Sequence, residues 1–468
     1  MEEDFYLEDE SFRDSVTTID EKGKRVWLYP FKPKGSLYKY RTYFSFFLLT
    51  IFFTLPFLKI DGHPLFMFNV LERTFIIFGY IFWPQDFHLF VLALITFIIF
   101  IVLFTTILGR LWCGWACPQT LFMEMIFRKV EYWIEGDANE QRKLNKSEWS
   151  PEKFKKKASK YTLFFFISFL ISNTFLAYLI GVDELYKIIT EPLSKHIGGF
   201  VGILIFTGVF YFVFAYMREQ VCLVVCPYGR LQGVMLDKNS MVVAYDHVRG
   251  EHREKYSKTK ERTGGDCIDC YHCVRVCPTG IDIRNGTQLE CINCTACIDA
   301  CDDVMEKVGF EKGLVRYASE NSISQNKKFA FTGRIYGYAA VLTILLTGLS
   351  YLLISRNDVE TTILRTPGVL FQRLENNQIS NLYNIKLINK TYDEVYPTFK
   401  ISETAASIKW VGKPISKIEK GSSVEGELFL ILPKEKLTGR KTSLKLIVLD
   451  QNGKEIESVK TTFLGPMN

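Results

Sequence analysis

The sequence predicts a multi-domain membrane protein, with five transmembrane helices in a bundle, a cysteine-rich insert before the last helix, and a C-terminal β-sandwich. Three features lead to this fold class: apolar runs of about 20 residues, eight cysteines within residues 267–301, and short β-rich runs after residue 358. The predicted domains are 1–40, an N-terminal tail; 41–237, transmembrane helices one to four; 238–331, the insert; 332–355, helix five; and 359–468, the sandwich.

The five predicted transmembrane helices are apolar runs, each close to the roughly 20 residues that cross a bilayer. They comprise residues 43–58, 88–108, 161–180, 198–217 and 332–354. Another apolar stretch, 65–83, carries Glu72 and Arg73 near its centre, where charges are costly in lipid. We therefore expect a re-entrant or interfacial segment there instead of a further span.

Basic residues gather in particular loops. Residues 109–160 hold eleven Lys and Arg and 218–331 hold sixteen, whereas 59–87 and 181–197 hold two each. By the positive-inside rule, the N-terminus and the insert are cytoplasmic, and the C-terminal domain lies on the outer side of the membrane. The net charge of +6 thus reports topology, and no nucleic-acid partner is expected. The acidic start, MEEDFYLEDE, predicts no cleavable signal peptide.

A duplicated cysteine spacing organises the insert. Residues 267–301 contain C-x2-C-x2-C-x3-C twice, the pattern of bacterial ferredoxins with two [4Fe-4S] clusters. Three closely spaced thiolates hold three corners of one cubane, and the fourth reaches the other cluster. The predicted ligand sets are Cys267, Cys270, Cys273 and Cys301 for one cluster, and Cys291, Cys294, Cys297 and Cys277 for the other. The insert is thus predicted to be a ferredoxin-like domain.

A structural zinc site is the alternative, because paired C-x2-C motifs also bind zinc. Zinc sites use four ligands in two pairs, whereas each run here has three evenly spaced cysteines and an offset fourth. The spacing therefore favours iron–sulfur clusters.

The four remaining cysteines, here called the membrane-edge cysteines, form a second paired motif. Cys113-x3-Cys117 and Cys222-x3-Cys226 are each followed by proline, just after the second and fourth predicted spans. Residues four apart share one helical face, so we expect each motif to present two thiols side by side, with the proline ending the helix. Two antiparallel helices then bring four sulfurs together at the membrane surface.

The alternative for these four residues is a structural role as small buried hydrophobic side chains. All twelve cysteines of the chain fall within the two kinds of motif, which favours a redox or metal role. Soft thiolates bind Cu(I), zinc or iron–sulfur clusters in preference to hard cations. Copper beside one-electron clusters makes a coherent redox device, whereas zinc has no redox purpose here. A further cluster or a redox dithiol stays open, because spacing does not exclude either.

The C-terminal region changes character. Its short β-rich runs are separated by Gly, Pro, Asn and Lys turns, and include 383–388, 407–411, 427–432, 443–449 and 458–463. About seven strands in roughly a hundred residues are typical of a β-sandwich. The region has no cysteine or histidine, so we expect no metal or catalytic site there. Docking to a partner and a folded spacer are the two alternatives.

Four stretches carry a family resemblance: CGWACPQTLF at 113–122, REQVCLVVCPYGRLQGVMLD at 218–237, DCIDCYHCVRVCPTGIDIRNG at 266–286, and LECINCTACIDACDDVMEKVGFEKGLVRYASEN at 289–321. With them the chain closely resembles the cytochrome c oxidase accessory family called CcoG, FixG or RdxA, over nearly its whole length. Asp302, where simple two-cluster ferredoxins have proline, matches that family.

The resemblance implies an immunoglobulin-like C-terminal domain and a cupric reductase that supplies Cu(I) to a cbb3-type oxidase. It also implies that Cys113, Cys117, Cys222 and Cys226 bind or reduce copper and that the eight ferredoxin cysteines relay electrons. The expected partners are the copper ion as substrate, the oxidase assembly machinery or a copper chaperone, and an electron donor that the sequence does not name.

Two other functions remain open at this point. One is a conduit that passes electrons from quinol or a soluble donor to a respiratory partner, with no metal substrate. The other is a non-enzymatic assembly scaffold or redox sensor whose C-terminal domain docks to the oxidase. The sequence shows no convincing nucleotide or flavin motif.

Overall fold

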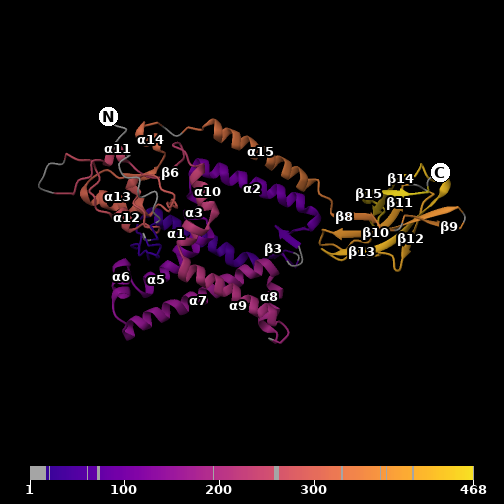
Figure 1. The fold of residues 1–468 in the computed structure, drawn as a ribbon, viewed down its shortest axis with the longest axis horizontal. Coiled ribbons are helices and arrows are strands. Elements are labelled where there is room, and N and C mark those ends of the chain that lie inside the picture. The colour runs from indigo at the N-terminus through magenta and orange to yellow at the C-terminus, as the bar shows by residue number, and fades with distance from the viewer. Residues whose placement is uncertain are drawn as a thin grey trace. The chain divides into compact units, whose positions relative to one another are not determined.

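The structure is a computed structural model that describes residues 17–19, 22–60, 62–70, 74–192, 194–257, 263–327, 330–368, 370–375, 377–402 and 405–466. The chain divides into two compact units (Figure 1). The first combines residues 1–55, 92–177 and 182–346, and the second combines 56–91, 178–181 and 347–468.

Four helices among the described residues are long and apolar enough to cross a membrane: Pro84–Leu108, Pro151–Ile180, Ile197–Met217 and Gly333–Ile354. They comprise α2 (Phe87–Leu108) after the 3-10 turn η4 (Pro84–Asp86), α7 (Pro151–Ile180), α9 (Ile197–Phe212) continued by the π-helix η6 (Val213–Met217), and α15 (Gly333–Ile354). The first predicted span, 43–58, lies in α1 (Ser36–Thr54) and the 3-10 turn η3 (Leu55–Phe57). α1 includes Lys39 and Arg41 and is not among the four, so the five-helix bundle stays a prediction.

The first unit packs its helices around aromatic side chains. Next to α7 and α9 lie α4 (Pro118–Phe122), the π-helix η5 (Met123–Phe127) and α5 (Arg128–Ile134). The Phe127 ring stacks on Phe214 with centroids 4.6 Å apart, and it meets Phe164 of α7 edge-on at 4.8 Å. Ser172 and Thr207 join α7 to α9 through a 2.9 Å hydrogen bond between their hydroxyls. These contacts hold the helices that lead into the membrane-edge cysteines.

Shorter helices connect the long ones. They are α3 (Leu111–Trp115), α6 (Ala138–Lys146), α8 (Val182–Thr190), the π-helix η7 (Val221–Val225) and α10 (Pro227–Met235). α6 begins with a capping box, in which the Asp137 side chain accepts backbone hydrogen bonds and Glu140 bonds back to the Asp137 N–H.

The apolar stretch at 65–83 contains no membrane-length helix among its described residues. It forms an antiparallel sheet of β3 (Phe66–Asn69), β4 (Thr74–Ile77) and β5 (Tyr80–Phe82), after a two-stranded ribbon of β1 (Lys59–Ile60) and β2 (His63–Pro64). The turn between β4 and β5 has positive φ at Phe78 (50°) and Gly79 (81°), as a tight two-residue hairpin requires. Glu72 and Arg73, which prompted the expectation of a non-spanning segment, lie outside the described residues.

A buried carboxylate ties this segment to the C-terminal domain within the second unit. Asp86 is 4% exposed and receives an ion pair from Lys390 at 2.7 Å and another from Arg356 at 2.7 Å. Lys390 also pairs with Glu360 of the first strand of that domain at 2.6 Å. Breaking one partner of such a buried set leaves an uncompensated charge, so the three elements are held together tightly.

The cysteine-rich insert is closed by one strand pair. β6 (Val242–Tyr245) runs antiparallel to β7 (Val315–Ala318), so the ends of the insert meet. Between them lie α11 (His247–Gly250), α12 (His272–Arg275), the 3-10 turn η8 (Ile283–Asn285) and α13 (Ala296–Val308), and α14 (Glu320–Ser324) follows. The Asp299 carboxylate of α13 accepts hydrogen bonds from the backbone N–H groups of Leu37 (3.2 Å) and Tyr38 (2.7 Å), and so caps the start of α1.

The C-terminal domain is a two-sheet β-sandwich. One sheet has the order β12 (Ser407–Val411), β13 (Ser423–Pro433), β10 (Gln378–Asn389), β8 (Val359–Arg365), with β9 (Gln372–Leu374) also paired to β10. The other has the order β11 (Thr398–Ile401), β14 (Lys441–Leu449), β15 (Glu455–Leu464). All the pairings are antiparallel, and the 3-10 turn η9 (Lys434–Lys436) links β13 to β14.

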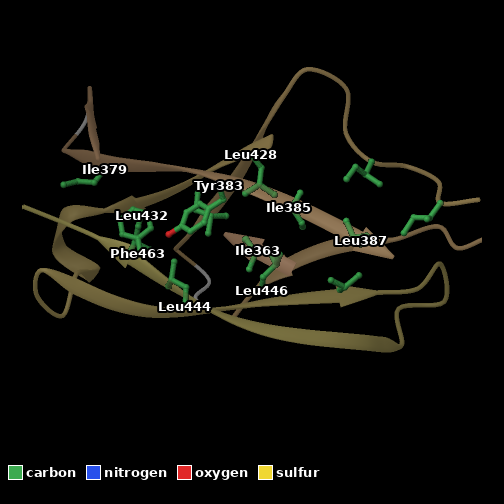
Figure 2. Packing of buried hydrophobic residues seen from close by; sticks show 14 residues of the cluster. Ile363, Ile379, Tyr383, Ile385, Leu387, Leu428, Leu432, Leu444, Leu446 and Phe463 are labelled. Carbon is green, nitrogen blue, oxygen red and sulfur yellow. The ribbon is translucent and has the colours of Figure 1, made fainter. Parts of the chain in front are cut away.

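The two sheets enclose an apolar core. Figure 2 shows side chains of both sheets, including Ile385 of β10 and Leu446 of β14, converging on the space between the ribbons. The alternating burial along β14 and β10 follows the two-residue period of strands. Tyr383 is fully buried and its hydroxyl donates to the Thr462 carbonyl oxygen at 2.9 Å, which satisfies the one polar group that it brings inside.

Candidate metal centre

The two cysteine runs of the insert have the same backbone. The residues on either side of the second cysteine have positive φ in both copies: Asp269 at 51° and Tyr271 at 57°, Asn293 at 52° and Thr295 at 64°. Positive φ is uncommon for residues other than glycine, and such strain gathers at functional sites. The left-handed turns curl each run so that its closely spaced thiols face one centre.

Each run borders a small cavity. One cavity, of about 350 Å³, is lined by Cys267, Cys270, Cys273 and Cys301. The other, of about 340 Å³, is lined by Cys277, Cys291, Cys294 and Cys297, and Cys273 reaches its wall as well. The two cavities are nearly equal in volume, and each is bordered by one of the predicted ligand sets. The assignment of ligands to clusters stays a prediction.

The donor set suits iron–sulfur clusters, of which this structure carries none. Burial raises the pKa of Cys273, Cys291 and Cys301 to about 12 and that of Cys294 to about 11. These thiols are therefore protonated at neutral pH, and binding a cluster displaces their protons. Among the described residues, no three or more His, Cys, Asp or Glu side chains are placed to hold a single metal ion. A cubane differs, because its four thiolates bind four separate irons.

Arg284 is a part of the first cavity that sequence reasoning missed. Its guanidinium pairs with Asp269 at 2.6 Å and Asp282 at 2.5 Å, and lies over the Tyr271 ring at 4.0 Å. It thereby fastens the first cysteine run to the segment that follows it. The cysteine spacing holds no signal for this residue, because its partners are set by the fold.

The first membrane-edge motif spans a break between two helices. Cys113 lies in α3, Cys117 has extended backbone with ψ of 125°, and Pro118 is the first residue of α4. The second motif repeats this at Cys226, with ψ of 109°, between η7 and α10. The prediction that a helix ends before each proline is therefore confirmed, but the helices end before Cys117 and Cys226, so the prediction that each pair shares one face of a continuing helix is wrong. Proline forces extended backbone on the residue before it and is well tolerated as the first residue of a helix.

The structure nevertheless brings the four membrane-edge thiols into one neighbourhood. Burial, with smaller contributions from the nearby thiols of Cys117, Cys113 and Cys226, raises the pKa of Cys222 to about 12 against the lowering effect of the Thr120 hydroxyl. Burial likewise raises the pKa of Cys113 to about 11, against the opposing charge of Arg110. A Cβ added at Gly229 of α10 would lie 2.8 Å from the Cys222 carbonyl oxygen, so only glycine lets α10 pack this closely on η7.

Polar side chains hold the thiols in place. The Cys113 Sγ donates to Gln232 Oε1 at 3.0 Å, and Arg110 Nε donates to the same oxygen at 3.1 Å. The Thr120 hydroxyl lies 3.9 Å from the Cys222 Sγ. Gln232 is fully buried, so its amide fixes both the thiol and the guanidinium.

The membrane-edge motif packs directly on the insert. Cys113 shares a buried cluster with Ile292 and Cys294, and Cys297 packs against that cluster. A Cβ added at Gly114 would lie 2.4 Å from the Ile292 carbonyl oxygen, so α3 touches the second cysteine run through its backbone. The Tyr317 hydroxyl donates to the Leu108 carbonyl oxygen and secures the same junction. Cys113 and the second cavity therefore share a wall, formed by Ile292 and Cys294.

Two buried arginines lie beside that wall, and sequence reasoning missed both. Arg41 is 2% exposed and Arg110 is 3% exposed. Their nitrogens bond to neutral oxygens, Arg41 Nε to the Gly114 carbonyl at 2.7 Å and Arg110 Nε to Gln232. Arg41 Nη2 and Arg110 Nη1 have no hydrogen-bond partner among the described residues. Buried cations with neutral partners require negative charge nearby, which thiolate-bound clusters supply.

A buried ion network supports the second membrane-edge motif. Arg218 has positive φ of 55°, lies between η6 and η7, and forms two hydrogen bonds with Glu131, at 2.9 and 2.7 Å. Burial opposes ionisation of Glu131, but Arg218, Lys160 and Arg128 outweigh it and lower its pKa to about 2. The network anchors the strained residue four positions before Cys222.

Comparison with known families follows the same division of the chain. A family described as a 4Fe-4S dicluster domain matches residues 217–320, and one described as a 4Fe-4S binding domain matches residues 89–137. A family described as an IG-like fold at the C-terminal of FixG matches residues 349–466. The immunoglobulin-like type expected for the C-terminal sandwich is thereby confirmed.

Three curated relatives match most of the chain. The nitrogen fixation protein FixG of Rhizobium meliloti is 30% identical over 489 residues, covering 94% of this chain and 93% of its own length. Protein RdxA of Cereibacter sphaeroides is 33% identical over 89% of this chain and 92% of its own length, and RdxB of the same organism is 31% identical over 84% and 86%. The chain belongs to the FixG/RdxA family of membrane-associated iron–sulfur electron-transfer proteins.

Proposed function

We propose that this protein is a cupric reductase that reduces Cu(II) to Cu(I) at the membrane-edge cysteines, for the copper supply and assembly of a cbb3-type cytochrome c oxidase. The observation that supports it most is the shared wall between Cys113 and the cavity of Cys294 and Cys297. Electron transfer needs close approach of donor and acceptor, and backbone contact at Gly114 allows it.

The proposed cluster ligands are the two crossed sets. Cys267, Cys270, Cys273 and Cys301 hold one [4Fe-4S] cluster, and Cys291, Cys294, Cys297 and Cys277 hold the other, which agrees with the residues that line each cavity. When bound, the clusters supply one-electron redox chemistry. The ferredoxin-like insert is proposed to face the cytoplasm of a bacterial inner membrane, and the immunoglobulin-like domain the periplasm.

The chain's own residues have distinct roles in this reaction. Cys113, Cys117, Cys222 and Cys226 are proposed to bind the copper substrate as thiolates after their sulfurs move closer together, because no three of these described residues are placed to hold one metal ion in this structure. Soft sulfur ligands favour Cu(I) over Cu(II). One electron enters per copper ion, and the thiols release their protons when the metal binds. Gln232 orients the Cys113 sulfur, and Arg110 offsets the negative charge of the thiolates. The proposed partners are an electron donor, and a copper chaperone or the oxidase assembly machinery as acceptor.

The test uses purified protein under anaerobic conditions with a chemical reductant. We expect wild type to accelerate Cu(II) reduction, and Cys113→Ser and Cys222→Ser to abolish this while the electron paramagnetic resonance signals of both clusters persist. Ser324→Ala, a matched surface change outside both sites, is the control and should behave as wild type. Undiminished copper reduction in both cysteine variants contradicts the site assignment.

A second variant tests the electron path separately from the copper ligands. Gly114→Ala places a methyl group against the Ile292 carbonyl and pushes α3 away from the second cysteine run. We expect copper binding and cluster signals to remain and the reduction rate to fall. Gly337→Ala, at a position with open space around it on α15, is the control. An unchanged rate in Gly114→Ala argues against this route.

A third [4Fe-4S] cluster at the membrane-edge cysteines is the second candidate, favoured by the 4Fe-4S binding domain match over residues 89–137, which include Cys113 and Cys117. The protein is then an iron–sulfur electron conduit without a metal substrate. Iron analysis separates the two, because a further cluster adds about four irons per chain. Loss of that iron in Cys113→Ser supports the conduit, and loss of bound copper supports the reductase.

A further inference from the structure

A cavity of about 710 Å³ opens beside the first turns of α7, away from the cysteines. Its lining includes four basic side chains, Lys153, Lys157, Lys160 and Arg218, and no carboxylate. The three lysines are spaced four and three residues apart, so they lie on one face of α7. Lys155 and Lys156 do not line the cavity. Three of the lysines near the start of α7 therefore line the cavity, and the other two do not.

The positive charge of the cavity is compensated only in part. Lys157 pairs with Glu135 at 2.8 Å, and Lys160 pairs with Glu135 at 3.0 Å and with Glu131 at 3.4 Å. Lys153 is 7% exposed, and its Nζ donates to two neutral backbone oxygens, of Asn145 at 3.1 Å and Ser147 at 2.5 Å. A buried ammonium with neutral partners leaves a positive potential that attracts an anion.

Aromatic rings border the same cavity. Trp27, Tyr29, Trp149 and Tyr161 line it, and Lys153 lies over the Trp149 ring at 5.3 Å. Trp149 is 75% exposed and Phe154, also in the lining, is 66% exposed. Exposed rings beside basic residues are typical of the boundary between a membrane and water, where amphipathic rings lie at the headgroup level.

The position of the basic residues along α7 indicates which anion the cavity can reach. The helix spans Pro151–Ile180, and its mainly apolar part without charged residues covers residues 161–180, enough for the hydrocarbon core. The basic residues therefore lie within about 15 Å beyond that core, because an α-helix rises about 1.5 Å per residue. Lipid phosphates occupy this level in every bilayer.

We propose that this cavity binds the headgroup of an acidic phospholipid, with the phosphodiester against Lys153, Lys157 and Lys160 and the lipid tails leaving past Tyr161. Basic pockets at the ends of transmembrane helices recognise such headgroups. Arg218 and Lys160 both bond to Glu131, so the bound lipid contacts the network that anchors the motif of Cys222. The site is separate from the cysteines, and its failure leaves the proposed reductase function untouched.

The test reconstitutes the full-length protein in nanodiscs of phosphatidylcholine with and without phosphatidylglycerol. We expect wild type to retain phosphatidylglycerol selectively after mild detergent extraction, measured by native mass spectrometry, and to unfold at a higher temperature in the acidic bilayer. The paired variant Lys153→Gln with Lys157→Gln should lose at least about tenfold in retention, the scale expected for two charge-assisted hydrogen bonds. The matched control, Lys155→Gln with Lys156→Gln, removes the same charge from positions of α7 that do not line the cavity. This variant should retain the lipid.

Two further measurements keep the result unambiguous. The single variant Lys157→Gln leaves the hydrogen bonds from Lys153 to the backbone intact. An unfolding temperature equal to that of wild type in pure phosphatidylcholine shows that a variant folds. Free glycerol phosphate added to detergent-solubilised protein tests the other source of a phosphate group, and stabilisation equal to that by the lipid overturns the lipid assignment. Equal retention by the two paired variants overturns the site itself.

Discussion

The C-terminal sandwich and the cysteine-rich insert are both small folded regions, but they are stabilised in different ways. All fourteen residues of the sandwich core are hydrophobic, and the largest of them, Tyr383, satisfies its hydroxyl internally. The core of the insert includes Cys267 and Cys273, with four more cysteines packed against it, and these side chains border cavities. We therefore expect apolar burial to stabilise the first region, and bound clusters to be needed for the stability of the second.

The difference extends to how each region tolerates charge. The basic and acidic side chains of the sandwich lie mainly on its surface, whereas Arg284 is buried against Asp282 at the wall of a cavity. At the junction with the membrane-edge motif, Arg41 and Arg110 are buried and bond to neutral oxygens instead of carboxylates. Buried charges therefore occur beside the cysteine sites as well as in the ion pairs of Asp86 and Glu131.

Removing the clusters should have the largest effect on stability, and it should affect the insert but not the C-terminal domain. Without them the cysteines face empty cavities, and we expect residues 238–331 to lose their fold while the C-terminal domain stays folded. The expected loss is on the order of 10 kcal/mol, the scale at which structural metals stabilise small domains. Limited proteolysis with mass spectrometry after iron chelation measures it. An insert that stays resistant to protease without iron contradicts the idea.

Phe463→Ala tests the apolar core of the C-terminal sandwich. The ring is fully buried between the sheets, so we expect a loss of about 3–5 kcal/mol in the free energy of unfolding of the C-terminal domain. Cluster signals should be unchanged. Leu364→Ala is the control, because Leu364 is 65% exposed on the same domain and its removal should cost less than about 0.5 kcal/mol. Calorimetry of the full-length protein measures both, and equal effects would refute the core assignment.

Glu131→Gln and low pH should weaken the network behind the membrane-edge motif. The pKa of Glu131 is about 2 in the folded protein and near 4.5 when unfolded, so its contribution is complete above pH 4.5 and is lost as the pH falls toward 2. The difference corresponds to about 3 kcal/mol. Thermal unfolding at pH 7 and at a pH near 2 should show a larger drop in wild type than in the variant. Glu152→Gln, at the exposed start of α7, should keep the drop.

Arg110→Gln should lower the midpoint potential of the nearby cluster by a small amount. Removing a buried positive charge beside Cys113 and Cys291 disfavours the reduced state of the nearby cluster. We expect its midpoint potential to fall by about 59 mV, a tenfold change for a one-electron couple. Redox titration followed by electron paramagnetic resonance measures it, with the exposed Arg230→Gln as control. Equal potentials in the two variants would show that Arg110 does not tune the cluster.

Much of this protein is determined by the sequence itself, because local spacing decides it. The repeat of three cysteines confines each run to a tight loop, apolar length decides which helices can cross a membrane, and two-residue alternation decides the strands of the sandwich. The three spans predicted at 88–108, 161–180 and 198–217 lie within membrane-length helices. Proline chemistry correctly predicts that a helix ends before Pro118 and before Pro227, but each proline also begins the next helix, and Cys117 and Cys226 between the helices have extended backbone.

Only the tertiary structure decided what surrounds the cysteines. Gly114 against Ile292, Asp299 capping α1, and Arg41 and Arg110 beside the shared wall all join segments far apart in the chain. No local pattern encodes such contacts, since they depend on how helices and loops pack once each has formed. The cysteine spacing specifies what the protein can bind, and the packing of distant segments decides which thiols lie near which cluster cavity.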